Sequence, residues 1–309
     1  MDVLNALTSS IFKSIIRLPA DSLPSDGRGL PAMIHSTPMC GRYVTVTKIK
    51  EIEKRFNVTA PNPSLYLPNT NISHGQLAPV ITDDKPHELQ FFQFGFTPSW
   101  GKKNFYMVNA RAEGDHNREN DPAYRGAMGI SQKPMFRKAI RSQRCLVIAD
   151  CFIEGPEKEK LNKPYVVYLR NGERPFATAG IWDEWVNPDT GEIIHSFAII
   201  TTVANSLLQK IGHHRSPVII PREHEADWLN RDLALNDALR MLQPYPAEAM
   251  NAYPIDPAIK NPLVNGIHLL QPIGQRVEKE FDYEVYDEIK LFGMGESPAR
   301  NRRKEEGGN

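Results

Sequence analysis

The chain has 309 residues, of which 40% are hydrophobic and 24% are charged. These fractions are ordinary for a globular protein, and the length is enough to bury one large core or two smaller ones. Lysine plus arginine and aspartate plus glutamate both number 37. This neutral total argues against a histone-like protein that binds nucleic acid through bulk charge.

The three cysteines, Cys40, Cys145 and Cys151, have neither CxxC nor paired Cys/His spacing. We therefore expect no disulfide framework, no metal and no cofactor. No apolar run approaches the roughly 20 residues needed to cross a bilayer, and the N-terminus lacks the basic start of a secretion signal. These features predict a cytoplasmic protein without a membrane partner.

The first residues differ in composition from the rest of the chain. Leucines and isoleucines in residues 4–15 are spaced as on one face of a helix, and residues 18–38 have the Pro/Gly/Ser-rich composition of a linker. We predict that residues 1–38 are an extension or linker outside the mature protein and that residues 39–285 form a single domain. Residues 286–309 are charged and poor in apolar side chains, so we predict a disordered tail.

Strand-like runs dominate the predicted domain. Alternating or continuous apolar patterns predict strands in residues 42–47, 88–96, 144–155, 163–170, 175–185 and 193–202. Helical spacing predicts helices in residues 47–57, 134–142, 205–211, 223–231 and 234–242. Because hairpin-like spacing prevails over strand–helix alternation, we predict an α+β fold with a curved, largely antiparallel, barrel-like sheet and flanking short helices.

The first motif with distinctive chemistry is MCGRY, residues 39–43. A cysteine at a chain start carries two nucleophiles, an α-amine with a pKa of about 8 and a thiol with a pKa of about 8.5. The two can close together on an aldehyde to give a thiazolidine. The alternative is that Cys40 is a small buried apolar residue ahead of a strand.

Three further motifs hold polar groups next to strand-like runs. In YMVNARAEG, Asn109, Arg111 and Glu113 alternate, so in an extended chain they share one face, either in a site or on a solvated edge strand. In CLVIADCFIEGP, Glu154 ends an apolar run, as a general acid/base or as a solvated turn residue.

The last of these motifs, HHRSP, comes after a predicted helix capped at Asn205 or Ser206. It places His213, His214 and Arg215 in a loop. Histidine is the natural proton carrier near pH 7. The alternative is that one histidine caps the helix and the other is solvated.

Together these motifs resemble the SOS-response-associated peptidase (SRAP) family of abasic-site crosslinking proteins. The resemblance spans roughly residues 39–245 and rests on MCGRY (39–43), GFTPSW (95–100), NARAE (109–113), RCLVIADCFIEG (144–155), TTVAN (201–205) and HHRSP (213–217). It implies covalent capture of abasic sites in single-stranded DNA during the DNA damage response, with possible autopeptidase and DNA lyase activity. We expect a monomer, associated with the nucleoid when bound to DNA.

The resemblance implies roles for four residues of the site. Cys40 matches the crosslinking cysteine, and Asn109 matches the asparagine that positions it. Glu154 matches the glutamate assigned to activation of the cysteine amine, self-processing and reversal of the link. His213 matches the histidine that helps to open the abasic sugar to its aldehyde.

The resemblance also implies DNA contacts. Arg42 and Arg111 match phosphate-contacting arginines, and Trp100 lies in a turn where an aromatic ring can stack on a neighbouring base. A basic segment without acidic residues, 131–144, could form one wall of a DNA groove or be a solvated helix face. Its charged residues are Lys133, Arg137, Lys138, Arg141 and Arg144.

The chain departs from the family pattern at three places. Ser216 stands where the family often has methionine, and Gly155 stands where it often has tryptophan. Residues ahead of Met39 form the largest departure, because the family cysteine is normally exposed by removal of the initiator methionine alone. We expect Cys40 to be exposed by an internal translation start at Met39 or by self-cleavage.

Two other functions stay open from the sequence. The same residues Cys40, His213 and Glu154 could serve a thiol peptidase, including one that cleaves only its own chain. A noncovalent single-strand binder would instead use the basic segment and the aromatic residues.

Overall fold

The computed structural model describes residues 41–170 and 172–280. The chain divides into two units, Met1–Thr37 and Pro38–Asn309, and all described residues belong to the second. Cys40, the predicted extension 1–38 and the predicted tail 286–309 lie outside the described residues. The domain boundaries proposed from the sequence therefore stay predictions.

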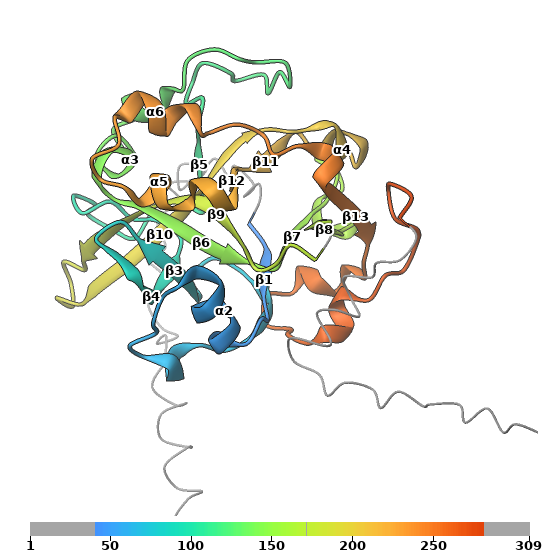
Figure 1. Cartoon of the computed structure of the whole chain (residues 1–309), viewed down its shortest axis with the longest axis horizontal. Coiled ribbons are helices and arrows are strands. Elements are labelled where there is room, and N and C mark those ends of the chain that lie inside the picture. The colour runs from blue at the N-terminus through green and yellow to red at the C-terminus, as the bar shows by residue number, and fades with distance from the viewer. Residues whose placement is uncertain (1–40, 171, 281–309) are drawn as a thin grey trace, which may run out of the picture. The chain divides into compact units, whose positions relative to one another are not determined.

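One sheet has five strands and is antiparallel throughout. Its order is β13 (Met250–Pro254), β8 (Tyr165–Leu169), β7 (Cys151–Glu154), β1 (Tyr43–Thr45) and β2 (Asn69–Ile72). Apart from β2, the strands of this and the second sheet can be found by their labels in Figure 1. Since β7 lies next to β1, the end of the RCLVIADCFIEG motif pairs with the strand that begins at the last residue of MCGRY.

The second sheet closes on itself. Five of its strands form a ring in the order β10 (Ile193–Val203), β4 (Lys85–Phe94), β3 (Leu77–Thr82), β6 (Arg144–Ala149) and β9 (Phe176–Val186), and β9 pairs back onto β10. Three short strands extend it: β5 (Asn109–Arg111), β11 (Arg215–Pro217) and β12 (Ile219–Ile220). The parallel strand pairs in the described part of the sheet are β10 with β4 and β10 with β5. The predicted α+β fold with a largely antiparallel barrel is confirmed.

The ring is narrow enough to require a glycine inside. Gly180 on β9 lies opposite Cys145 on β6, and a Cβ atom at Gly180 would lie 2.7 Å from the Cys145 sulfur. A side chain at this position would therefore push the two strands apart. All six residues of β6 are buried, which explains why its sequence is a continuous apolar run instead of an alternating one.

The helices are short and cover the sheets. They are α2 (Ile49–Phe56), α3 (Ala139–Ser142), α4 (Ser206–Lys210), α5 (Glu225–Leu229) and α6 (Leu235–Arg240). Single turns of 3₁₀ helix lie at Pro63–Leu65, Gly129–Gln132, Lys160–Asn162, Arg222–His224, Ala247–Ala249, Pro257–Lys260 and Ile267–Leu270. The predicted helix 134–142 is thus a helix only over its last four residues. No helix among the described residues is both long and apolar enough to span a membrane.

Candidate active site and DNA-binding surface

The register between β1 and β7 brings the start of the domain to Glu154. Tyr43 pairs with Phe152 and Val44 with Cys151, and the backbone amide of Ile153 donates to the carbonyl oxygen of Arg42 at 2.9 Å. Continued by one residue, this antiparallel register sets Gly41 opposite Glu154. Gly41 is the first described residue and comes directly after Cys40 in the sequence.

Glu154 contacts His213 in the interior. His213 Nε2 lies 3.2 Å from Glu154 Oε2, and each side chain is only 6% exposed. His213 Nδ1 lies 2.9 Å from the carbonyl oxygen of Arg215 and 3.4 Å from the backbone nitrogen of Arg215, so it can donate to the first or accept from the second, according to its tautomer. The contact between Nε2 and Oε2 needs one proton, held by the imidazole or by the carboxylate. The pair is therefore built to hold and transfer one proton.

The loop that carries His213 is fixed by its helix. Asn205 caps α4 by accepting from the Leu208 amide at 3.1 Å, as its place in the sequence predicts. The backbone amide of His213 in turn donates to the carbonyl of Leu208 at 2.9 Å. His213 thus closes the last turn of α4 through its backbone, but it is not a solvated residue, because its ring is buried and faces a carboxylate.

His214 lies over His213. The two rings are stacked with centroids 5.3 Å apart, and His214 Nδ1 lies 3.4 Å from Glu157 Oε2. Burial lowers the pKa of His214 below its ordinary value of 6.5, and the opposing attraction of Glu157 only partly compensates. This second histidine is thus held toward its neutral form beside the Glu154–His213 pair.

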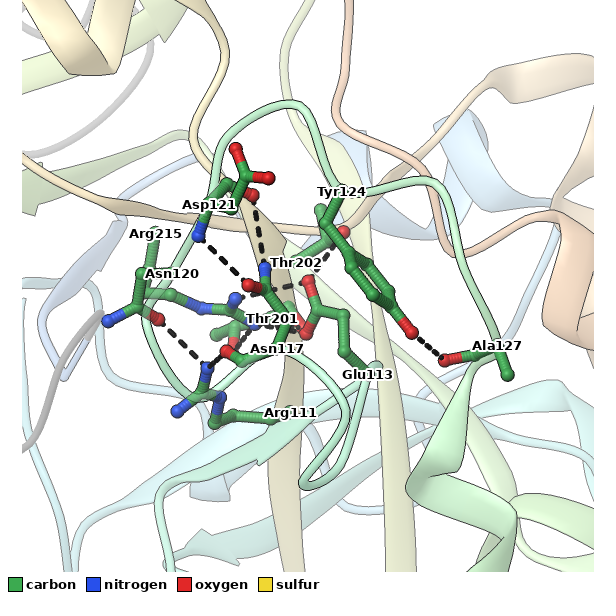
Figure 2. Close-up of polar contacts among 10 residues, drawn as sticks. All are labelled: Arg111, Glu113, Asn117, Asn120, Asp121, Tyr124, Ala127, Thr201, Thr202 and Arg215. Carbon is green, nitrogen blue, oxygen red and sulfur yellow. Dashed lines mark hydrogen bonds and ion pairs between the residues drawn. The ribbon is translucent and has the colours of Figure 1, made fainter.

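A buried ion pair supports the strand that comes after the histidines. Arg215 donates from Nη1 to Glu113 Oε1 at 3.1 Å and from Nη2 to Glu113 Oε2 at 2.7 Å, and Nη2 also donates to the carbonyl of Thr201 at 2.9 Å. The two charged side chains are at most 1% exposed. Figure 2 shows Glu113 facing Arg215 beside Thr201 and Thr202 of β10. Glu113 comes two residues after β5, and Arg215 is the first residue of β11. The ion pair therefore connects β11 to the chain that continues from β5, on either side of β10.

The NARAE residues do not form a solvated edge. β5 runs parallel to β10, with Asn109 opposite Ile199 and Arg111 opposite Thr201. Arg111 is half-buried and donates to the carbonyl oxygen of Asn117 and, at 2.9 Å, to Asn120 Oδ1. Burial, reinforced by the charge of Arg215, lowers the pKa of Arg111. The loop after β5 therefore holds the guanidinium in place (Figure 2).

Arg42 is held near the same end of β1. Its Nη1 donates to Asn71 Oδ1 at 2.8 Å, and its Nη2 donates to the carbonyl oxygen of Lys260 at 3.1 Å. Burial lowers its pKa. Both acceptors are neutral, so the positive charge of Arg42 is not cancelled by these two contacts.

Trp100 protrudes from a fixed loop. Its side chain is 57% exposed, while the loop is anchored from β9: Asp183 accepts from the Ser99 amide at 2.8 Å, and the Trp185 indole donates to the carbonyl of Gly101 at 2.6 Å. Lys138 Nζ lies 3.3 Å from Ser99 Oγ and 3.4 Å from Asp183 Oδ1. The exposed ring and the basic segment 131–144 therefore adjoin.

The basic segment is less free than its sequence suggests. Lys133 pairs with Asp115 at 2.7 Å, and Arg141 donates to the carbonyls of Ser131 and Arg137. Arg144 is fully buried and donates to the carbonyls of Trp228 at 2.8 Å and Asn230 at 2.5 Å. The inclusion of Arg144 in a possible groove wall is therefore wrong, because its charge serves the core.

Gly155 accounts for one departure from the family pattern. A Cβ atom there would lie 1.9 Å from the carbonyl oxygen of Lys160, a distance that no side chain tolerates. The loop after Glu154 therefore occupies the space where the family tryptophan would begin.

Among the residues that the structure describes, no cluster of histidine, cysteine and acidic side chains could hold a metal ion.

Sequence reasoning missed Asp183 and Asn71 as supports of site residues. Asp183 lies between two tryptophans in a buried strand, and a lone carboxylate in such a run signals a satisfied structural role. Asn71 lies in β2, a short polar strand that the sequence patterns did not predict.

Comparisons with known proteins agree on one family. A family model described as SOS response associated peptidase (SRAP) matches residues 39–262. The "Abasic site processing protein YoqW" of Bacillus subtilis (strain 168) is 32% identical over 240 residues, which cover 75% of this chain and 99% of that protein. The "Abasic site processing protein HMCES" of Xenopus tropicalis is 23% identical over 230 residues, 63% of each chain.

Solved structures agree with the fold. A protein from Bacteroides thetaiotaomicron superposes with a TM-score of 0.64 at 29% identity, covering 75% of this chain and 99% of that one. A protein from Bordetella bronchiseptica superposes with a TM-score of 0.55 at 23% identity, covering 70% and 100% of the two chains. The second likeness is one of fold alone.

Proposed function

Because the chain belongs to the SOS response associated peptidase (SRAP) family, we propose that it processes abasic sites in DNA, the activity that the names of its relatives state for them. More specifically, it captures the abasic site in single-stranded DNA through a covalent link to Cys40. The ring-opened sugar of an abasic site presents an aldehyde, and the link shields this lesion.

The proposed reaction condenses three groups. The α-amine of an N-terminal Cys40 adds to the aldehyde carbon, and loss of one water gives an imine. The Cys40 thiolate then adds to the imine carbon, and the nitrogen takes up the proton that the thiol gave up. Aldehyde, amine and thiol thus become one thiazolidine ring and one water, with no oxidant or reductant.

The observation that carries the proposal is the buried Glu154–His213 contact of 3.2 Å. The β1–β7 register sets Gly41, the residue after Cys40, opposite Glu154. The contact therefore supports proton transfer close to the proposed nucleophile. Glu154 takes a proton from the amine and returns it to the departing hydroxyl. His213 carries the proton that opens the sugar. Opening the hemiacetal moves one proton from the hydroxyl on the anomeric carbon to the ring oxygen, which leaves an aldehyde.

A free amine is a condition of this chemistry. Within an intact chain the nitrogen of Cys40 is part of an amide, whose lone pair is delocalised into the carbonyl. Removal of residues through Met39 is therefore part of the proposal. The active form starts at Cys40, and the form that retains residues 1–39 is inert.

Recognition in this proposal rests on the strand that flanks the lesion, because an abasic nucleotide has no base to read. Trp100 is exposed enough to stack on a flanking base. Arg42 and Arg111 supply positive charge for phosphates. Lys138 adjoins the Trp100 loop, and Lys133, Arg137 and Arg141 continue this basic surface. Asn109 is proposed to orient Cys40.

A denaturing gel with the chain starting at Met39 tests the proposal. Mixed with a single-stranded oligonucleotide that has one abasic site, the protein should give a shifted band that survives denaturation. An intact oligonucleotide and one whose abasic aldehyde has been reduced with borohydride should give none. The full-length chain tests the alternatives: loss of residues 1–39 without a shift on abasic DNA would indicate a thiol autopeptidase instead, and no change in either would indicate a noncovalent binder.

Three variants separate the roles. Cys40→Ala should abolish the link, whereas Glu154→Gln and His213→Ala should slow it about 10²- to 10⁴-fold, the usual contribution of acid/base groups. Glu157→Gln is the matched control, because this exposed carboxylate contacts His214 and not His213. A denaturation-resistant complex with Cys40→Ala would overturn the assigned chemistry. Mass spectrometry of each N-terminus shows which chains start at Cys40.

A further inference from the structure

A concave site lies at the other end of β7 from Glu154. A pocket of about 310 Å³ is lined by Thr47, Glu51, Lys54, Arg55, Gly172, Arg174, Pro175 and Arg222. Thr47 donates from its amide to Asp150 at 2.9 Å, and Asp150 directly precedes β7, whose last residue is Glu154. The pocket is therefore separate from the Glu154–His213 contact.

Three distant segments bring positive charge into this pocket. Lys54 and Arg55 come from α2, Arg174 from the loop between β8 and β9, and Arg222 from the 3₁₀ turn before α5. α2, drawn in blue in Figure 1, is joined to β1 by a few residues that include Thr47. Four cations from three segments repel one another unless negative charge lies among them.

The acidic groups nearby offset only part of this charge. Arg55 is matched by Glu225, with contacts of 2.7 and 3.0 Å. Asp150 is satisfied by the amides of Val46 and Thr47 and by the Thr47 hydroxyl. Glu51 is the one carboxylate that lines the described pocket. Within the described residues, neither Lys54 nor Arg222 has a carboxylate at salt-bridge distance. The lining therefore retains an excess of positive charge.

We propose that this pocket binds a phosphate-bearing anion. Guanidinium and ammonium groups converging from several directions match the tetrahedral oxygens of a phosphate. The volume of about 310 Å³ exceeds that of a single small ion and accommodates two linked phosphate groups. The lining has no aromatic side chain, so a nucleobase gains no stacking there and the phosphate itself carries the affinity.

Titration calorimetry with inorganic pyrophosphate at low ionic strength tests this site. Arg222→Gln and Lys54→Gln should each weaken binding about five- to twentyfold, because each removes a charged hydrogen-bond donor. Glu51→Gln should tighten binding, because it removes the one carboxylate from the lining. Lys50→Gln is the matched control on the same helix, since Lys50 pairs with Glu53 and does not line the pocket.

The signs of these effects decide the proposal. No binding of pyrophosphate by the unchanged protein would overturn it, as would weakening by Lys50→Gln equal to that by Lys54→Gln. A second titration with a short intact single-stranded oligonucleotide identifies the source of the phosphate. If Arg222→Gln weakens oligonucleotide binding too, the pocket takes the DNA backbone, and if it weakens pyrophosphate alone, the pocket takes a small anion. Covalent capture through Cys40 is measured separately, and if the pocket takes a small anion it should be unchanged in all four variants.

Discussion

Replacing Glu113 by glutamine should destabilise the domain strongly. The side chain of Arg215 is fully buried and that of Glu113 is 1% exposed, and the carboxylate accepts two hydrogen bonds, of 3.1 and 2.7 Å, from the guanidinium. In Glu113→Gln the charge of Arg215 stays buried beside a neutral amide. One of the two guanidinium N–H groups then faces the amide NH₂, which cannot accept its hydrogen bond. Breaking a buried pair in this way costs about 3–5 kcal/mol.

This cost is a large part of the stability of a domain, which is about 5–15 kcal/mol. For a domain of this size each kcal/mol shifts the melting temperature by about 2–4 °C, so Glu113→Gln should lower it by roughly 6–20 °C. Urea unfolding followed by circular dichroism measures the free energy directly. Because the backbone of Arg215 contacts His213 Nδ1 at 2.9 Å, the same variant should also slow capture of the abasic site.

A matched control and a double variant make the reasoning refutable. Glu88→Gln breaks an exposed pair with Lys85, whose side chains are 52% and 40% exposed, and should cost at most about 1 kcal/mol. Glu113→Leu combined with Arg215→Met removes both charges and should cost less than Glu113→Gln alone. Equal losses for Glu113→Gln and Glu88→Gln would refute the view that burial makes this pair costly to break.

Three further outcomes are expected from named contacts. Asp183→Asn should weaken binding of intact single-stranded DNA about three- to tenfold in an anisotropy titration, because the Trp100 loop loses a charged acceptor, whereas the exposed neighbour variant Glu184→Gln should not. Gly155→Ala should cost about 1–3 kcal/mol in thermal unfolding, since its Cβ would lie 1.9 Å from the Lys160 carbonyl; an unchanged midpoint would contradict the clash. Burial lowers the pKa of His214, so below its unfolded value of 6.5 the unfolded chain binds more protons, and stability should fall as pH falls through the window below 6.5. His214→Gln should flatten this dependence, and an unaltered pH profile would place its origin elsewhere.

The architecture of the domain was largely readable from local patterns. Apolar patterns and short turns predicted the strands that became β1, β4, β6, β7, β8, β9 and β10. A strand buried on one face alternates with a period of two, and a strand buried on both faces, such as β6, is a continuous run. Short or polar strands escaped prediction. β3 contains Pro79, and β2 is mostly polar, so neither has a pattern that differs from that of a loop.

The candidate site was predicted as a set of residues whose roles the family resemblance implies, and the structure places two of them, Glu154 and His213, in contact. Their contact depends on the β1–β7 register and on the loop after α4, which are set by pairing between segments distant in the sequence. Cys40 lies outside the described residues, so its role stays a prediction.

What the sequence determined by itself is thus the set of chemical groups, the strand pattern and the family motifs. Only the tertiary structure decided which of the charged side chains are exposed and unpaired enough to contact DNA. Arg144 belongs to a basic run yet is fully buried, Lys133 and Lys138 face Asp115 and Asp183 from other segments, and Arg215 faces Glu113. The reason is physical: the energy of a charge depends on its burial and on the nearest opposite charge, and in a folded chain both are fixed by residues that are far away in the sequence.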